Sequence, residues 1–182
     1  EARGYSSVWT VSVVLKKDQM LAYRVGRYRD DRDAFADKRS VCFPGAIAAE
    51  DASLFSGDPF GVKDCAISVL VQDLDLSFSS FEPESSSPLL IDCVMVAETE
   101  KSGFDLIVVV RWNCPDWFEP STRRLSIKEP HWLCVSQNNN NVDDFEPWSA
   151  RILTRCSDWK NQDASVNKND YHSASCISSL RT

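Results

Sequence analysis

Alternation of apolar and polar residues dominates this chain, and it predicts strands. In residues 7–15 every second side chain is apolar, which places these side chains on one face of an extended segment because a strand has a period of two. The polar residues 16–19 then predict a turn, and residues 20–28 predict the returning strand. The start of the chain therefore predicts an antiparallel hairpin whose first arm is marked by Trp9, Val11, Val13 and Leu15.

The clearest predicted hairpin lies in the middle of the chain. Its arms are Leu89 to Ala97 and Phe104 to Trp112, and the polar residues 98–103 join them. The second arm is apolar on both faces, which is typical of a central strand. Further short strands are predicted at Arg124 to Lys128, Trp132 to Ser136 and Trp148 to Cys156.

Two other segments have distinct patterns. Pro44 to Phe55 is rich in alanine and predicts a short helix that Pro44 begins and Gly57 ends. Cys65 to Phe78 predicts a long extended segment, and its apolar face changes sides near Gln72. Such a change indicates a bulge or a bend between two sheets.

These elements predict a mainly β fold, an antiparallel β-sandwich or flattened barrel of about eight strands with one short helix. We expect a single β-rich domain over residues 1–182, since 182 residues suit one domain. Residues 157–182 are rich in Ser, Asn and Asp, and predict an irregular tail.

Charge and hydropathy exclude two classes of partner. The formal net charge is −7, and residues 41–100 hold one lysine against eleven acidic residues. An acidic middle repels phosphate backbones, so we expect no nucleic acid partner. The longest purely aliphatic run, Leu106 to Val110, is too short to span a membrane.

One basic cluster interrupts this acidic composition. Its arginines are interleaved with aspartates 30, 31 and 33, which is typical of a solvated loop. The functional alternative is a patch for an acidic partner. The arginines are Arg24, Arg27, Arg29 and Arg32.

The cysteines predict disulfides and an oxidising compartment. They are evenly scattered and no CxxC pair occurs, which argues against zinc ribbons and favours long-range bridges in a secreted protein. The chain begins at Glu1 without an apolar leader, so we expect a mature secreted or surface-exposed chain, or an excised domain. The alternative is buried thiols in a reducing compartment. The disulfide candidates are Cys42, Cys65, Cys93, Cys114, Cys134, Cys156 and Cys176.

The sequence offers little catalytic chemistry. His131 and Cys134 lie three positions apart, on opposite faces of a strand, and His172 lies in the polar tail. Asp73 and Asp75 would share a strand face and could divide acid and base roles, although a solvent-exposed edge explains them as well. We therefore predict no catalytic residues, no metal site and no cofactor, and lean against enzymatic activity.

Aromatic residues in a predicted loop give the candidate binding site. Trp117 and Phe118 follow a turn, and loop aromatics on a rigid sheet are common binding anchors. The alternative is that both plug the end of a core. We assign the binding role to Arg111, Trp117, Phe118 and Arg123.

Three functions compete for this chain. The first is a secreted or surface-displayed β-sandwich that binds another protein, resembling an effector, decoy or projecting domain, and we favour it. The second is a carbohydrate-binding module that uses the loop aromatics. The third is an enzyme with an unrecognised carboxylate site, for which Asp73 and Asp75 are the candidates.

Overall fold

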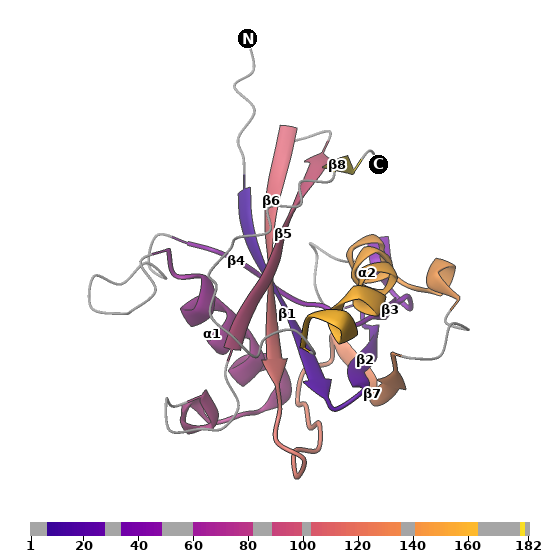
Figure 1. The fold of residues 1–182 in the computed structure, drawn as a ribbon. Coiled ribbons are helices and arrows are strands. Elements are labelled where there is room, and N and C mark those ends of the chain that lie inside the picture. The colour runs from indigo at the N-terminus through magenta and orange to yellow at the C-terminus, as the bar shows by residue number, and fades with distance from the viewer. Residues whose placement is uncertain are drawn as a thin grey trace. The chain divides into compact units, whose positions relative to one another are not determined.

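The computed structural model describes residues 7–27, 34–48, 60–81, 89–99, 103–135, 141–163 and 179–180. These residues fall into two compact units, which are described separately (Figure 1). The first unit draws on residues 1–13, 43–113 and 174–182, and the second on residues 14–42 and 114–173. Strand β1 (Ser7–Lys16) contributes its first part to the first unit and its last residues to the second.

The first unit is built on a long antiparallel pair, β5 (Leu89–Thr99) and β6 (Gly103–Asn113). This pair confirms the predicted central hairpin, and β6 lies between β1 and β5, as its apolar faces predicted. Strand β4 (Phe43–Ala46) pairs antiparallel with β1. Strand β8 (Ser179–Leu180) pairs parallel with β5, so this unit has a mixed sheet.

Helix α1 (Val62–Leu74) replaces the extended segment predicted at Cys65 to Phe78, which was wrong. The short 3-10 helix η3 (Phe78–Phe81) follows it. Many residues of α1 are β-branched, which misled the prediction, but Val62, Ala66, Leu70 and Leu74 are buried at a spacing of four. That spacing is helical, and it packs Val62 and Ala66 against Val108 and Val110 of β6.

The helix predicted at Pro44 to Phe55 is also wrong, because Phe43–Ala46 forms β4; residues 49–55 lie outside the described part of the chain. Register decides the outcome: Gly45 lies opposite Thr10 of β1. A Cβ on Gly45 would lie 2.5 Å from Val69 Cγ2 of α1. The close approach of α1 therefore requires glycine in β4, and this packing overrides the helix propensity of the alanines.

The second unit is organised around β2 (Gln19–Val25), which pairs antiparallel with β1, with β3 (Arg39–Ser40) and with β7 (Ile127–Cys134). The pairing of Leu15 with Met20 confirms the first predicted hairpin. The two strands predicted at 124–128 and 132–136 are one strand, β7, with a bulge in the middle. Glu129 and Pro130 lie opposite Tyr23 there, and Glu129 has a φ of 51°.

Helix α2 (Pro147–Asp163) replaces the strand predicted at Trp148 to Cys156, which was wrong. Pro147 is its first residue, where a missing N–H costs nothing. Glu146 caps the helix by accepting hydrogen bonds from the backbone N–H groups of Trp148 and Ser149, both at 2.9 Å. The 3-10 helix η4 (Val142–Asp144) precedes the cap.

The structure corrects the predicted fold class. The fold is mainly β, but α1, α2 and the parallel β5–β8 pair exclude a plain antiparallel β-sandwich or barrel with one short helix. The expectation of one domain stays a prediction. The irregular tail predicted at residues 157–182 is wrong where the structure describes it, because α2 continues to Asp163 and Ser179–Leu180 forms β8. Residues 164–178, including His172 and Cys176, lie outside the described part. Among the described residues, no helix is long and apolar enough to cross a bilayer.

The cysteines do not pair as predicted. No disulfide joins any two of the described cysteines, so the prediction of disulfides among these five is wrong. Cys65, Cys93 and Cys134 lie in α1, β5 and β7, whereas Cys42 and Cys114 lie just outside strands. Burial raises the pKa of the Cys114 thiol to about 12, which keeps it protonated. The side chains of Cys156 and Cys176 lie outside the described part. The five are Cys42, Cys65, Cys93, Cys114 and Cys134.

Candidate anion-binding site

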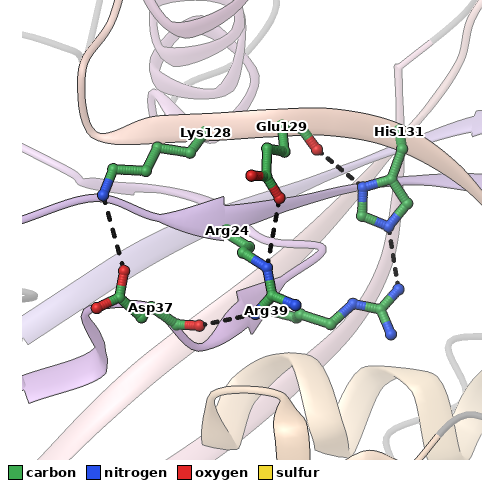
Figure 2. Close-up of polar contacts among 6 residues, drawn as sticks. All are labelled: Arg24, Asp37, Arg39, Lys128, Glu129 and His131. Atoms are coloured by element: carbon green, nitrogen blue, oxygen red, sulfur yellow. Dashed lines mark hydrogen bonds and ion pairs between the residues drawn. The ribbon is translucent and has the colours of Figure 1, made fainter.

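Three cations lie side by side across three strands of the second unit. Arg24 of β2 pairs in register with Arg39 of β3 and with Lys128 of β7. Directly opposed residues share a face of the sheet, and like charges so placed repel each other. We name Arg39, Arg24 and Lys128 the cationic ladder (Figure 2). It stands in a chain whose net charge is −7.

Backbone contacts fix the ladder in place. Val25 N–H donates to the carbonyl of Lys38 (2.9 Å), and Asp37 N–H donates to the carbonyl of Val25 (2.8 Å). On the other side of β2, Gly26 N–H donates to Ser126 O (2.8 Å), and a Cβ on Gly26 would lie 2.2 Å from Leu125 O. The end of β2 is therefore held from both sides.

Two carboxylates compensate part of the charge. Glu129 lies 3.4 Å from Arg24 Nε, and Asp37 lies 3.0 Å from Arg27 and 3.7 Å from Lys128. The hydrogen bond from Arg27 holds the pKa of Asp37 below its ordinary value. The side chains of Arg24 and Lys128 remain 42% and 43% exposed, so a ligand in solution can reach them.

Arg39 has a different environment. Its guanidinium donates to Nε2 of His131 at 3.0 Å and lies 4.5 Å from the ring centre of Phe145. Within the described part of the chain, no carboxylate lies at ion-pair distance from Arg39. Its charge is therefore held in place by an imidazole and an aromatic face without being neutralised.

The cap of α2 anchors the backbone of Arg39. Glu146 N–H donates to the carbonyl of Arg39 at 2.9 Å. The neighbouring Ser40 hydroxyl lies 3.2 Å from Glu146 Oε1, and the Ser149 hydroxyl donates to the same carboxylate. Glu146 is 1% exposed. This buried network fixes β3, so Arg39 projects from a rigid support.

The structure separates the residues of the binding site predicted from sequence. Trp117 is 76% exposed, whereas Phe118 is buried at 3%, so the pair is neither all surface nor all core. Arg123 is exposed. Arg111 belongs to the first unit, is buried, and lies 3.9 Å from Asp92 on the neighbouring strand. The role of these four residues in binding stays a prediction.

The turn that carries Trp117 is clamped to the β1–β2 turn. Lys16 Nζ donates to the Phe118 carbonyl and to the Glu119 carboxylate, both at 2.8 Å. Lys17 pairs with Asp116 at 2.9 Å. The hydrogen bond from Lys16 holds the pKa of Glu119 below its ordinary value. We name residues 114–119 the Trp117 turn.

The strand face predicted for Asp73 and Asp75 is wrong. Asp73 is buried in α1, and Asp75 follows the helix in a left-handed conformation, so they do not share a strand face. Sequence reasoning noticed Arg24 and Arg27 as a basic cluster. It missed Arg39, Lys128 and the role of His131, because β3 and β7 are about ninety residues apart along the chain and only their pairing with β2 joins them.

Comparison with known proteins identifies the fold. No family model and no curated protein sequence matches the chain. A Nudix hydrolase from Alicyclobacillus acidocaldarius superposes with a TM-score of 0.65 at 9% identity, covering 94% of this chain and 100% of that one. The Nudix domain of Shewanella oneidensis NrtR, in complex with ADP ribose, gives a TM-score of 0.54 at 9% identity, covering 88% and 90%.

A third similar structure is a bifunctional NMN adenylyltransferase/ADP ribose pyrophosphatase from Francisella tularensis, in complex with AMP and a manganese ion. It gives a TM-score of 0.54 at 12% identity and covers 87% of this chain and 43% of that one. The fold of this chain is therefore that of the Nudix hydrolases.

This fold corrects the functional interpretation. The prediction of a secreted or surface-displayed effector, decoy or projecting domain is wrong. It rested on a β-sandwich with disulfides and no catalytic residues, but the fold is shared with hydrolases and no disulfide joins the described cysteines. A fold shared with hydrolases also counts against the expectation of no catalytic activity. Of the three hypotheses, the enzyme alternative agrees best with the fold. The expected extracellular location stays a prediction.

Proposed function

We propose that this chain binds the diphosphate group of a nucleoside diphosphate derivative such as ADP-ribose and hydrolyses its phosphoanhydride bond. The observation that carries the recognition is the cationic ladder with its uncompensated Arg39, set in a Nudix fold. ADP ribose is the ligand named for the NrtR Nudix domain, which supports this choice of compound.

The ladder suits a diphosphate for electrostatic reasons. Neighbouring strands lie about 4.8 Å apart, so three cations in register present donors across two such spacings. Arginine offers planar paired donors to phosphate oxygens, and lysine adds a point charge. Binding of an anion would also relieve the repulsion between Arg24 and its two neighbours. The ligand would then supply negative charge that the carboxylates of the chain do not provide.

The proposed reaction is the addition of water to one phosphorus of the diphosphate. The bond between that phosphorus and the bridging oxygen breaks, and ADP-ribose and water give AMP and ribose 5-phosphate. One hydrogen of the water goes to each phosphate monoester, and both are released to solvent as protons above the second pKa of the monoesters, about 6. Guanidinium groups at the phosphate oxygens would stabilise the charge of the transition state. The likeness of fold to a Nudix hydrolase supports the hydrolytic step.

A divalent cation finds no ligand set among the described residues. No group of three or more His, Cys, Asp or Glu side chains in that part of the chain could hold a metal ion. Helix α1 carries Asp64 in its first turn and a buried Asp73, and its remaining buried positions are apolar or cysteine. These residues do not fit the manganese ion named for the Francisella protein, so we assign no step to a metal.

The test combines binding and turnover of ADP-ribose. Calorimetry measures affinity, and chromatography measures AMP and ribose 5-phosphate, with manganese and with EDTA. An Arg39→Ala variant purified in the same way controls for contaminating hydrolases. We expect binding and product formation that both weaken in the variant. Binding without product would overturn the hydrolysis, the absence of both would overturn the whole proposal, and equal turnover by the variant would overturn the assignment to the ladder.

A further inference from the structure

The contact between Arg39 and His131 fixes the state of the imidazole. A guanidinium can only donate, so Nε2 of His131 accepts the hydrogen bond from Arg39 at 3.0 Å. A carbonyl can only accept, so Nδ1 carries a proton and donates to Glu129 O at 2.8 Å. Figure 2 shows both contacts of the ring, and acceptance at Nε2 with donation at Nδ1 is the hydrogen-bonding pattern of an uncharged imidazole.

The bulge in β7 makes this arrangement possible. Glu129 takes a left-handed backbone conformation, with a φ of 51°. Its carbonyl then lies 2.8 Å from the imidazole two residues ahead, and the ring is held by its own strand. A bulge commonly re-aims a neighbouring side chain. Here it orients Nε2 of His131 toward Arg39, on the opposite side of β2.

A neutral acceptor differs from the carboxylates elsewhere in the site. Glu129 and Asp37 each neutralise a cation that they orient, but His131 accepts a hydrogen bond and leaves the full positive charge on Arg39. A guanidinium has five N–H donors, and His131 takes one of them. Phe145, on the path to α2, supports the guanidinium through its ring face. Such a group is oriented in advance for an anion.

We propose that His131 is a positioning residue, which holds the Arg39 guanidinium ready to donate to a phosphate group of the ligand. The inference rests on the ligand class of the proposed function and goes beyond it, because it assigns one phosphate contact to Arg39 and the orientation of that contact to His131. The residues that carry it come from β3, from β7 and from the segment before α2, all in the second unit.

The test uses inorganic pyrophosphate as the probe, in EDTA at pH 8, with calorimetry of the wild type and four variants. Arg39→Ala should weaken binding about tenfold or more, which corresponds to the loss of one hydrogen bond between charged groups. His131→Leu, which removes the acceptor, should weaken it severalfold. His131→Gln keeps an acceptor oxygen near the position of Nε2 and should restore most of the affinity. Thermal unfolding of every variant monitors stability.

The double variant Arg39→Ala/His131→Leu separates a positioning role from a structural one. If His131 acts through Arg39, the second substitution adds no loss to the first. Additive losses, a Gln variant as weak as the Leu variant, or a wild type that binds no pyrophosphate would each overturn the inference. Pyrophosphate has no nucleoside, so failure here with ADP-ribose still turned over leaves the proposed function standing. If the losses of pyrophosphate affinity are non-additive but the chain does not bind ADP-ribose, the proposed function is overturned and the role of His131 stands.

Discussion

The Trp117 turn and the cationic ladder both gather charge at the ends of strands in the second unit, but they balance it differently. At the turn, Lys16 and Lys17 each pair with a carboxylate within 3.0 Å, Glu119 and Asp116. On the ladder, Arg39 meets an imidazole and an aromatic ring in place of a carboxylate. The lysines at the Trp117 turn are neutralised by carboxylates, whereas the positive charge of Arg39 on the ladder is not.

This difference indicates whether an exposed aromatic side chain or an uncompensated charge is the better sign of a binding site. Trp117 is more exposed than Arg24 or Lys128 of the ladder, and its place in a predicted loop suggested the binding site from sequence. The clamp of Lys16 on the Phe118 carbonyl has a simpler explanation, because it seals a buried phenylalanine. Uncompensated charge on a rigid strand is the more specific signal, since it costs stability unless something binds there.

The largest expected effect separates the two neighbours in the Trp117 turn. Phe118→Ala removes a buried ring packed against Trp132 and should lower the free energy of unfolding by about 3–5 kcal/mol. Trp117→Ala, the matched control, should change it by about 0.5 kcal/mol or less, because its side chain is mostly in solvent. Urea denaturation measures both. Equal losses would show that the turn is not divided into core and surface.

The next largest effect comes from giving the ladder an ion pair like those at the Trp117 turn. His131→Glu would give Arg39 a carboxylate partner, and we expect ADP-ribose affinity to fall about tenfold or more while stability holds or rises, because the retained charge is neutralised. Lys17→Ala is the matched control, since it removes the cation that pairs with Asp116 of the Trp117 turn and should leave affinity unchanged. A loss of affinity in the control as large as in His131→Glu would show that total charge, and not the ladder, decides binding.

A smaller effect concerns acid. The pKa values of Asp37 and Glu119 both lie below their ordinary values in the folded chain, held there by Arg27 and Lys16 respectively. Each group therefore contributes stability above the ordinary carboxyl range, and that contribution is lost as the pH falls through the lowered pKa. We expect unfolding midpoints to decline below about pH 4. Asp37→Asn and Glu119→Gln should each flatten this decline, and an unchanged acid profile would contradict the assignment.

The smallest effect tests the exposed pair at the turn. Lys17 and Asp116 are 71% and 67% exposed and lie 2.9 Å apart. Exposed pairs contribute about 0–1 kcal/mol. A double-mutant cycle with Lys17→Ala and Asp116→Ala should therefore give a coupling energy near the lower end of that range, and it should shrink in high salt. A salt-resistant coupling above that range would show that the clamp is stronger than its exposure implies.

The strand hairpins could be predicted from sequence and the helices could not, for physical reasons. Alternation in 7–15 and 104–112 carries the register of each hairpin locally. Helix α1 is rich in valine and isoleucine, and its period becomes clear only when β6 shows which residues it buries. The alanines near Pro44 favour helix by propensity, but pairing of β4 with β1 overrides it.

Only part of the candidate site could be predicted from the sequence. Arg24 and Arg27 stood out as basic residues, and a patch for an acidic partner was the functional alternative. What sequence could not supply is the register that sets Arg39 and Lys128 beside Arg24, because β3 and β7 are about ninety residues apart along the chain. His131 gave no signal of its own, since its role depends on a bulge that places Glu129 in a left-handed conformation.

The most direct test of the account is an NMR titration of the isotope-labelled chain with ADP-ribose, following backbone amide and arginine side-chain signals. We expect shifts at residues 37–40 and 127–131 and at the Nε–H of Arg24 and Arg39, with little change at 114–119. Shifts confined to the Trp117 turn, or a spectrum that the ligand leaves unaltered, would contradict it.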